Sequence, residues 1–175
     1  GLGDVYKRQT GNPGTGKTTI ARILAKYLKA IGALRGGQLV EVTRADLVGR
    51  YVGHTAPLTN SVIQSALGGV LFIDEAYALY RGGEDSFGLE AIDTLVKGIE
   101  DHRDDLVVIL AGYTKEMQLF LSANSGLASR FPNQIEFPDY TGAELYKILC
   151  SIARSKGYTP VSYTHLRAHE TAANL

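Results

Sequence analysis

The chain has 175 residues, of which 45% are hydrophobic, and its 18 basic residues balance its 18 acidic residues. This length and composition are typical of one globular domain with a core of its own. The single cysteine, Cys150, has no partner within the chain, which excludes a disulfide-rich scaffold and favours a reducing, cytoplasmic compartment. No apolar run approaches the ~18 residues that cross a bilayer, and the neutral charge balance argues against a nucleic-acid surface. We therefore expect neither a membrane nor a nucleic-acid partner.

Hydrophobic periodicity predicts the elements of the first half of the chain. Residues 18–31 place apolar side chains at helical spacing, which predicts a helix that faces the core. Residues 38–43 are a strand candidate, and a second helix fits residues 59–67. The continuous apolar run 70–73 predicts a parallel strand buried on both faces.

The same alternation continues in the second half. An amphipathic helix is predicted over residues 89–99, a wholly apolar strand over 106–111 and a last strand over 135–137. Strands that alternate with helices of this length imply right-handed crossovers. The sequence therefore predicts an α/β fold, an open parallel sheet with helices on both faces.

The two ends of the chain depart from this pattern. Residues 1–9 stand where a strand would lead into the first loop, but they include charges that a buried strand does not hide cheaply. Residues 160–175 break the helical pattern that begins at Thr141. Both segments resemble translated sequencing-adaptor or assembly scars, so we expect non-native tails and set them aside in assigning the fold. The alternative is an unusual native terminus.

A glycine-rich motif precedes the first helix, because residues 11–18 satisfy G-x-x-x-x-G-K-[ST]. In such a loop, backbone N–H groups converge on phosphates at the positive end of the helix. Lys17 is placed to reach the β and γ phosphates, and the Thr18 hydroxyl to ligate Mg²⁺. An ordinary glycine-rich turn is the alternative. The expected nucleotide-binding residues here are Gly11, Asn12, Pro13, Gly14, Thr15, Gly16, Lys17, Thr18 and Thr19.

Two adjacent acids, Asp74 and Glu75, follow the buried strand. The carboxyl ends of parallel strands face the crevice in which open α/β sheets bind ligands. We expect Asp74 to hold Mg²⁺, and Glu75 to orient the attacking water and take its proton. An acid pair after a strand is by itself more often a solvated turn, but the phosphate motif favours the catalytic interpretation.

Two other segments contain candidate residues outside any periodic pattern. Tyr51-Val52-Gly53 would expose an aromatic ring on a loop, unless the tyrosine packs beneath its own loop. Arg130, just before the last strand, would reach a γ-phosphate held by a neighbouring subunit and stabilise the transition state. A surface salt bridge is the alternative for Arg130.

Together these motifs resemble the AAA+ ATPases, in particular the group of stage V sporulation protein K and the red-type, CbbX-like Rubisco activases. The resemblance extends from Gly11 to about Ile152. It implies that residues 11–18 are the Walker A motif and that Asp74-Glu75 are the Walker B acids. It also implies that Tyr51-Val52-Gly53 is the pore loop that grips a substrate polypeptide, and that Arg130 is the arginine finger.

The resemblance further implies a homo-hexamer with ATP between subunits, in which hydrolysis moves Tyr51 along a bound protein. Residues 10–138 would form the nucleotide-binding core and residues 139–159 the start of a helical lid. Tyr113 occupies the strand end where most AAA+ proteins carry a polar sensor, so we include it among the expected nucleotide-binding residues.

Other functions stay open from the residues alone. A P-loop phosphotransferase would share the phosphate motif, but it would need a second substrate pocket and neither Glu75 nor Arg130. A nucleic-acid motor is disfavoured by the zero net charge. A nucleotide-binding fragment without turnover is the remaining alternative.

Overall fold

The computed structural model describes residues 5–9, 17–131 and 133–136, together with residues 147, 150, 151, 153, 154 and 157. Within these residues, parallel strands form one sheet in the order β2-β3-β4-β1-β5. The predicted α/β fold with a parallel sheet is thus confirmed. The strands are β1 (Val5–Gln9), β2 (Leu39–Val42), β3 (Val70–Ile73), β4 (Val107–Ala111) and β5 (Asn133–Glu136).

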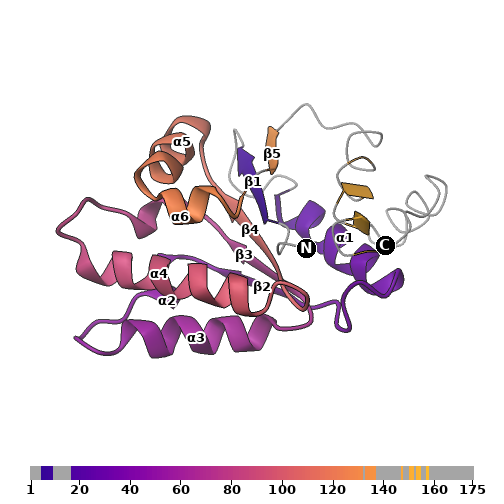
Figure 1. Cartoon of the computed structure of the whole chain (residues 1–175), viewed down its shortest axis with the longest axis horizontal. Coiled ribbons are helices and arrows are strands. Elements are labelled where there is room, and N and C mark those ends of the chain that lie inside the picture. The colour runs from indigo at the N-terminus through magenta and orange to yellow at the C-terminus, as the bar shows by residue number, and fades with distance from the viewer. Residues whose placement is uncertain are drawn as a thin grey trace.

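Helices cover both faces of this sheet (Figure 1). Because successive strand residues point to opposite faces, Val70 and Phe72 of β3 pack in the cluster with α1, whereas Leu71 and Ile73 pack in the cluster with α3 and α4. The described helices are α1 (Lys17–Ala30), α2 (Arg44–Leu47), α3 (Thr55–Ala66), the 3-10 helix η1 (Ala76–Leu79), α4 (Ser86–Asp101), α5 (Thr114–Ala123) and α6 (Ser125–Ala128).

The central strands form the core, as their apolar sequences predict. Every residue of β3 and of β4 is buried. A parallel strand covered by helices on both faces has no side left for polar residues. The acids and the tyrosine that follow these strands are therefore held by the most buried part of the molecule.

Some helices differ from the prediction. Helix α3 begins at Thr55 instead of residue 59, because Pro57 falls in the first turn, where a backbone N–H has no partner within the helix. Helix α5 was not predicted, and it buries Met117, Phe120 and Leu121. The short helices α2, η1 and α6 were also missed, since one helical turn is too short to show a period.

The charged N-terminal run forms a strand. β1 lies between β4 and β5, with Val5 in register with Val108 and Tyr6 in register with Asn133. The expectation that its charges break the strand pattern was wrong, because the ladder is built from backbone groups that each of these residues carries. The proposal that residues 1–9 are non-native concerns their origin and stays a prediction. Residues 160–175 lie outside the described part of the chain.

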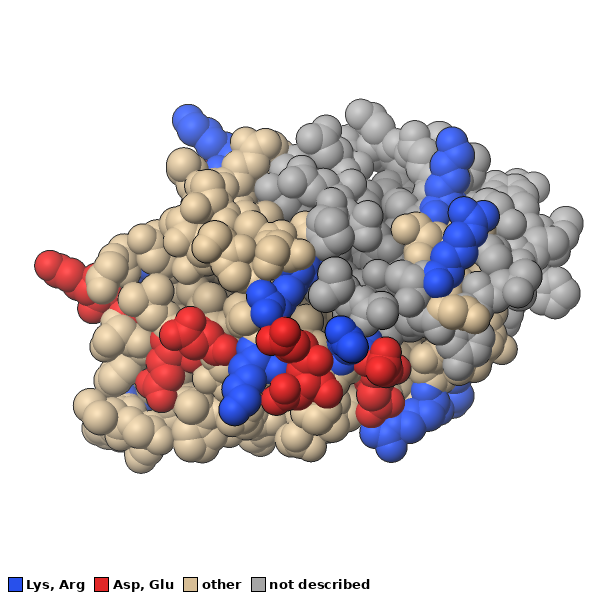
Figure 2. Space-filling view, viewed as in Figure 1, with Lys and Arg blue, Asp and Glu red and all other residues tan. Residues whose placement is uncertain are grey.

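Charged side chains of both signs share the face shown in Figure 2, where red and blue groups lie side by side over α4. The sequence of α4 contains Glu90, Asp93, Lys97, Glu100 and Asp101. Among the described residues, no helix combines the length and the apolar character needed to span a membrane. Cys150 is buried.

Candidate active site

The N-terminus of α1 lies at the edge of the sheet where β2 and β3 end. Glu41 of β2 is in register with Phe72 of β3, just before the acid pair. The Thr18 hydroxyl, in the first turn of α1, donates to Glu41 Oε2 at 3.3 Å. This contact places Thr18 at the edge from which Asp74 and Glu75 follow.

Asp74 and Glu75 differ in how the backbone holds them. The Asp74 N–H donates to the Val42 carbonyl at 2.9 Å, which extends the β2–β3 ladder by one residue. Asp74 Oδ1 accepts from the Glu75 N–H at 3.0 Å. Asp74 is half-buried and Glu75 is exposed. The two acids are thus presented in different settings, one tied to the sheet and one open to solvent.

Glu75 has a left-handed backbone conformation, with φ 47° and ψ 47°. Among the described residues it is the only non-glycine with positive φ. This conformation costs about 1–3 kcal/mol for an ordinary L-residue and is concentrated at functional sites. The Glu75 carbonyl accepts from the Ala78 N–H at 2.9 Å, so the strained residue begins the turn of η1.

Two tyrosines lie near these acids. Tyr113 follows β4 and is exposed. Tyr77, which sequence reasoning missed, packs so closely on Gly112 that a Cβ there would lie 2.9 Å from Tyr77 Cδ1. Burial and then the negative charge of Glu75 raise the pKa of Tyr77, because both disfavour the phenolate. Its position two residues after the acid pair was the available signal.

Arg130 is held within its own chain. Its Nη2 lies 2.9 Å from Glu100 Oε2, and its Nη1 donates to the Gly126 carbonyl at 2.7 Å. The salt bridge that we considered as the alternative is therefore present. A role toward a neighbouring subunit stays a proposal, and it requires that Arg130 leave these partners.

Residues 48–54 form a loop that is half-buried at Val48 and Gly49 and exposed from Arg50 onward. Tyr51 is 67% exposed, and its ring meets the His54 ring edge-on with 5.5 Å between centroids. Tyr51 does not pack beneath its own loop. The loop and the start of α3 border an open groove of ≈ 540 Å³. Gly53 has φ 83°, a conformation that favours glycine.

The remaining phosphate-loop residues, Gly11 to Gly16, lie outside the described part of the chain. Lys17 and Thr19 are described only as backbone of the first turn of α1. Within the described residues, no group of three or more His, Cys, Asp or Glu side chains could hold a metal. The oxygen donors at this edge, the Thr18 hydroxyl and the acids, are nevertheless the hard ligands that suit Mg²⁺ when phosphates complete its shell.

Comparison with known proteins now assigns the family. The family model described as "ATPase family associated with various cellular activities (AAA)" matches residues 9–139. The chain belongs to the AAA family. The AAA match spans strands β2 to β5, the acid pair, the exposed loop and Arg130, and it begins at the last residue of β1.

Several curated proteins are similar to this AAA chain. Stage V sporulation protein K of Bacillus subtilis (strain 168) is 58% identical over 138 residues, which are 79% of this chain and 43% of that protein. Protein CbbX of Cereibacter sphaeroides is 53% identical over 91% of this chain and 53% of its own length. The chloroplastic ribulose bisphosphate carboxylase/oxygenase activase of Cyanidioschyzon merolae (strain NIES-3377 / 10D) is 56% identical over 79% of this chain and 48% of its own length. The chain thus spans about half the length of these relatives.

A solved structure agrees on the fold. The FIGL-1 AAA domain in complex with ADP matches with a TM-score of 0.53 at 20% identity, covering 97% of this chain and 54% of that one. At this identity the likeness shows the AAA fold and nothing finer.

Proposed function

We propose that the protein is a Mg²⁺-dependent ATPase that converts ATP hydrolysis into movement of a bound protein, as a homo-hexamer in the cytoplasm. The observation that carries the proposal is the strained Glu75 beside Asp74 at the carboxyl end of β3, in a chain of the AAA family. The family match favours this function over a P-loop phosphotransferase.

The proposed roles follow from the sequence motifs and, for the described residues, from their positions in the fold. The loop from Gly11 to Gly16 and Lys17 would bind the phosphates, with Thr19 and Tyr113 completing the contacts to nucleotide. Thr18 and Asp74 would hold Mg²⁺, which neutralises phosphate charge when bound. Glu75 would hold the attacking water and accept its proton.

The exposed loop containing Tyr51 is the argument for a protein substrate. An aromatic ring that is 67% exposed contributes little to its own fold, but it offers apolar area to an extended polypeptide. Tyr51, Val52 and Gly53 would grip that polypeptide in the hexamer pore. The relatives' names indicate different cellular roles, so the proposal commits to a protein substrate and not to its identity.

The proposal is tested by ATP turnover of the full-length gene product with and without EDTA. Glu75→Gln should keep ATP affinity and lower turnover by about 100-fold or more, because the phosphate-binding groups remain while the base is lost. Equal turnover in Glu75→Gln and the parent, or turnover that survives EDTA, would contradict the proposal.

The role of Arg130 in a neighbouring subunit requires a mixing experiment. Arg130→Ala should bind ATP like the parent, and its own turnover should fall by about a thousandfold. Arg130→Ala subunits have intact Glu75, so mixing them with Glu75→Gln subunits should restore part of the turnover. No restoration in mixed hexamers would contradict a role between subunits.

A further inference from the structure

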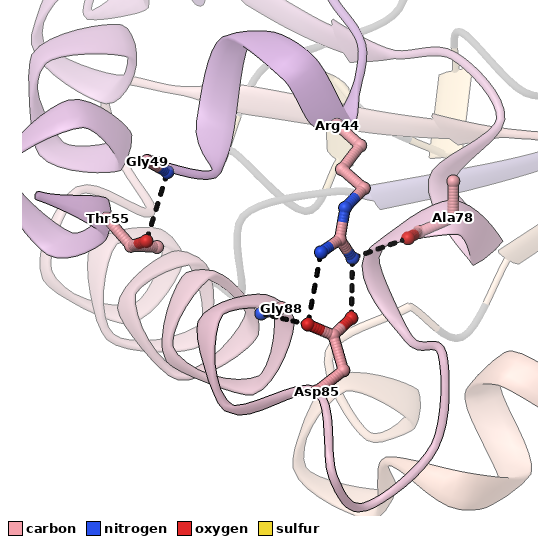
Figure 3. Close-up of polar contacts among 6 residues, drawn as sticks. All are labelled: Arg44, Gly49, Thr55, Ala78, Asp85 and Gly88. Carbon is pink, nitrogen blue, oxygen red and sulfur yellow. Dashed lines mark hydrogen bonds and ion pairs between the residues drawn. The ribbon is translucent and has the colours of Figure 1, made fainter. Parts of the chain in front are cut away.

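One ion pair connects three elements close to the proposed hydrolytic site. Arg44 Nη1 donates to Asp85 Oδ2 at 2.6 Å, and Arg44 Nη2 donates to Asp85 Oδ1 at 3.0 Å. Arg44 Nη1 also donates to the Ala78 carbonyl of η1 at 2.8 Å. Asp85 Oδ1 accepts in turn from the Gly88 N–H in the first turn of α4, at 3.1 Å. Figure 3 shows the Arg44 guanidinium between η1 and the start of α4.

The Arg44–Asp85 pair is enclosed and closely fitted. The side chains are only 17% and 14% exposed. A Cβ on Gly88 would collide with the Leu79 carbonyl and the Asp85 carboxylate, so the cluster leaves no room for a side chain there. A largely desolvated ion pair adds little net stability, because the cost of removing two charges from water offsets their attraction. Its bidentate geometry, in contrast, fixes the relative position of the groups it joins.

On one side, the pair holds the turn that contains Glu75. The Ala78 carbonyl, which Arg44 binds, belongs to the residue whose N–H donates to the Glu75 carbonyl at 2.9 Å. A change in the Glu75 backbone would therefore shift Ala78, and with it the carbonyl that accepts the hydrogen bond from Arg44.

On the other side, the pair holds the base of the Tyr51 loop. Arg44 begins α2, and the Val48 N–H donates to the Arg44 carbonyl at 2.9 Å. The loop is closed by the Gly49 N–H on Thr55 Oγ1 at 3.0 Å, drawn in Figure 3, and by Thr59 Oγ1 on the Leu47 carbonyl at 2.8 Å. Leu47, Thr55 and Thr59 are fully buried. The base of the loop is thus tied to both α2 and α3, so a shift of α2 relative to α3 would either strain these buried bonds or carry the loop with it.

We propose that Arg44 is a positioning residue that couples the turn containing Glu75 to the loop containing Tyr51, through its bidentate contact with Asp85 and its bond to the Ala78 carbonyl. The inference rests on the proposed function, because it assigns the path by which the nucleotide state reaches the substrate loop. Coupling of this kind requires that the contacts of Arg44 differ between nucleotide states, because two sites are coupled only through an element with two arrangements.

The test uses the full-length gene product with Tyr51→Trp. The 175 residues contain no tryptophan, and any tryptophan elsewhere in the full-length product is first replaced by phenylalanine. Emission is compared between a non-hydrolysable ATP analogue and ADP, and nucleotide affinity is measured separately. The variants are Arg44→Met, Arg44→Lys and Asp85→Asn. Arg35→Met is the matched control, because Arg35 also makes a two-bond contact with an aspartate, donating from Nε and Nη2 to Asp105 at 2.9 and 2.7 Å, but is 70% exposed.

We expect Arg44→Met and Asp85→Asn to reduce the emission difference by about fivefold or more while nucleotide affinity is retained. Arg44→Lys should be intermediate, because an ammonium cannot reproduce the fork of a guanidinium. Arg35→Met should match the parent. If Arg44→Met does not fold, Arg44→Lys and Asp85→Asn decide. An emission difference of parental size in folded variants that bind nucleotide overturns the coupling. Failure of the parent itself to bind nucleotide instead overturns the proposed function.

Discussion

Glu100 of α4 accepts a hydrogen bond from Arg130 Nη2 at 2.9 Å, although the two residues are 30 positions apart. The Arg130 side chain is 20% exposed and that of Glu100 is 61% exposed. An ion pair whose acid is open to water holds its partner by about 1 kcal/mol or less. Arg130 is therefore occupied in the single chain, but this ion pair is weak enough to be compatible with the proposed transfer of Arg130 to a nucleotide of a neighbouring subunit.

At protein concentrations where only part of the protein is assembled, Glu100→Gln should raise ATP turnover by about two- to fivefold. In this variant Arg130 no longer has to leave the charged Glu100 before it reaches a neighbouring subunit. Turnover measured against protein concentration checks this. Asp101→Asn is the matched control, since it removes an exposed acid from the same helix. An equal rise in Asp101→Asn, or none in Glu100→Gln, would remove Glu100 from this role.

Glu75→Gly should stabilise the fold while stopping hydrolysis. Glycine adopts the φ of 47° seen at this position without the steric cost borne by glutamate, so we expect a gain of about 1 kcal/mol in the free energy of unfolding. Glu75→Ala keeps that steric cost and serves as the control. Urea unfolding of the two variants measures the difference, and a glycine variant no more stable than the alanine variant would show that the strain is not stored at this residue.

Asp85 should make the free energy of unfolding depend on pH in the acidic range. Its hydrogen bond with Arg44 lowers the pKa of the Asp85 carboxyl, so its contribution is fully present above the ordinary aspartate pKa and is lost as the pH falls through the lower, folded-state pKa. The stability gap between the parent and Asp85→Asn should stay constant from about pH 7 to 5 and narrow below about pH 4. Urea unfolding across this range tests it. A stability difference that grows as the pH falls would contradict a lowered pKa of Asp85.

Tyr51→Ala should leave basal ATP turnover unchanged and abolish its coupling to substrate movement. Because the side chain is 67% exposed, the free energy of unfolding should change by about 0.5 kcal/mol or less. Leu119→Ala is the matched control, with an apolar side chain that is 64% exposed on α5. Once a client protein is known, remodelling by both variants is compared. Full remodelling by Tyr51→Ala would argue against a grip by this ring.

Local pattern explains what the sequence could predict. The apolar run of β3 and the periodic helix α1 were found with nearly the observed limits, because a strand buried on both faces and a helix with one apolar stripe leave clear marks in a short window. The position of Asp74 and Glu75 at the carboxyl end of β3 followed from the same run. Helix α5 was missed although its buried residues, Met117, Phe120 and Leu121, have helical spacing.

Contacts between distant residues were decided by tertiary structure alone. Arg44 and Asp85 are 41 positions apart, and nothing in either local sequence selects one charged partner over another. The occupied state of Arg130 and the left-handed backbone of Glu75 are likewise set by how α4, α6 and η1 pack around the sheet. The sequence by itself determined the elements and the chemical groups at their ends, because these depend on neighbours along the chain. Only the fold decided which of those groups meet, because that depends on the spatial order of the strands in the sheet and on how the helices pack against it.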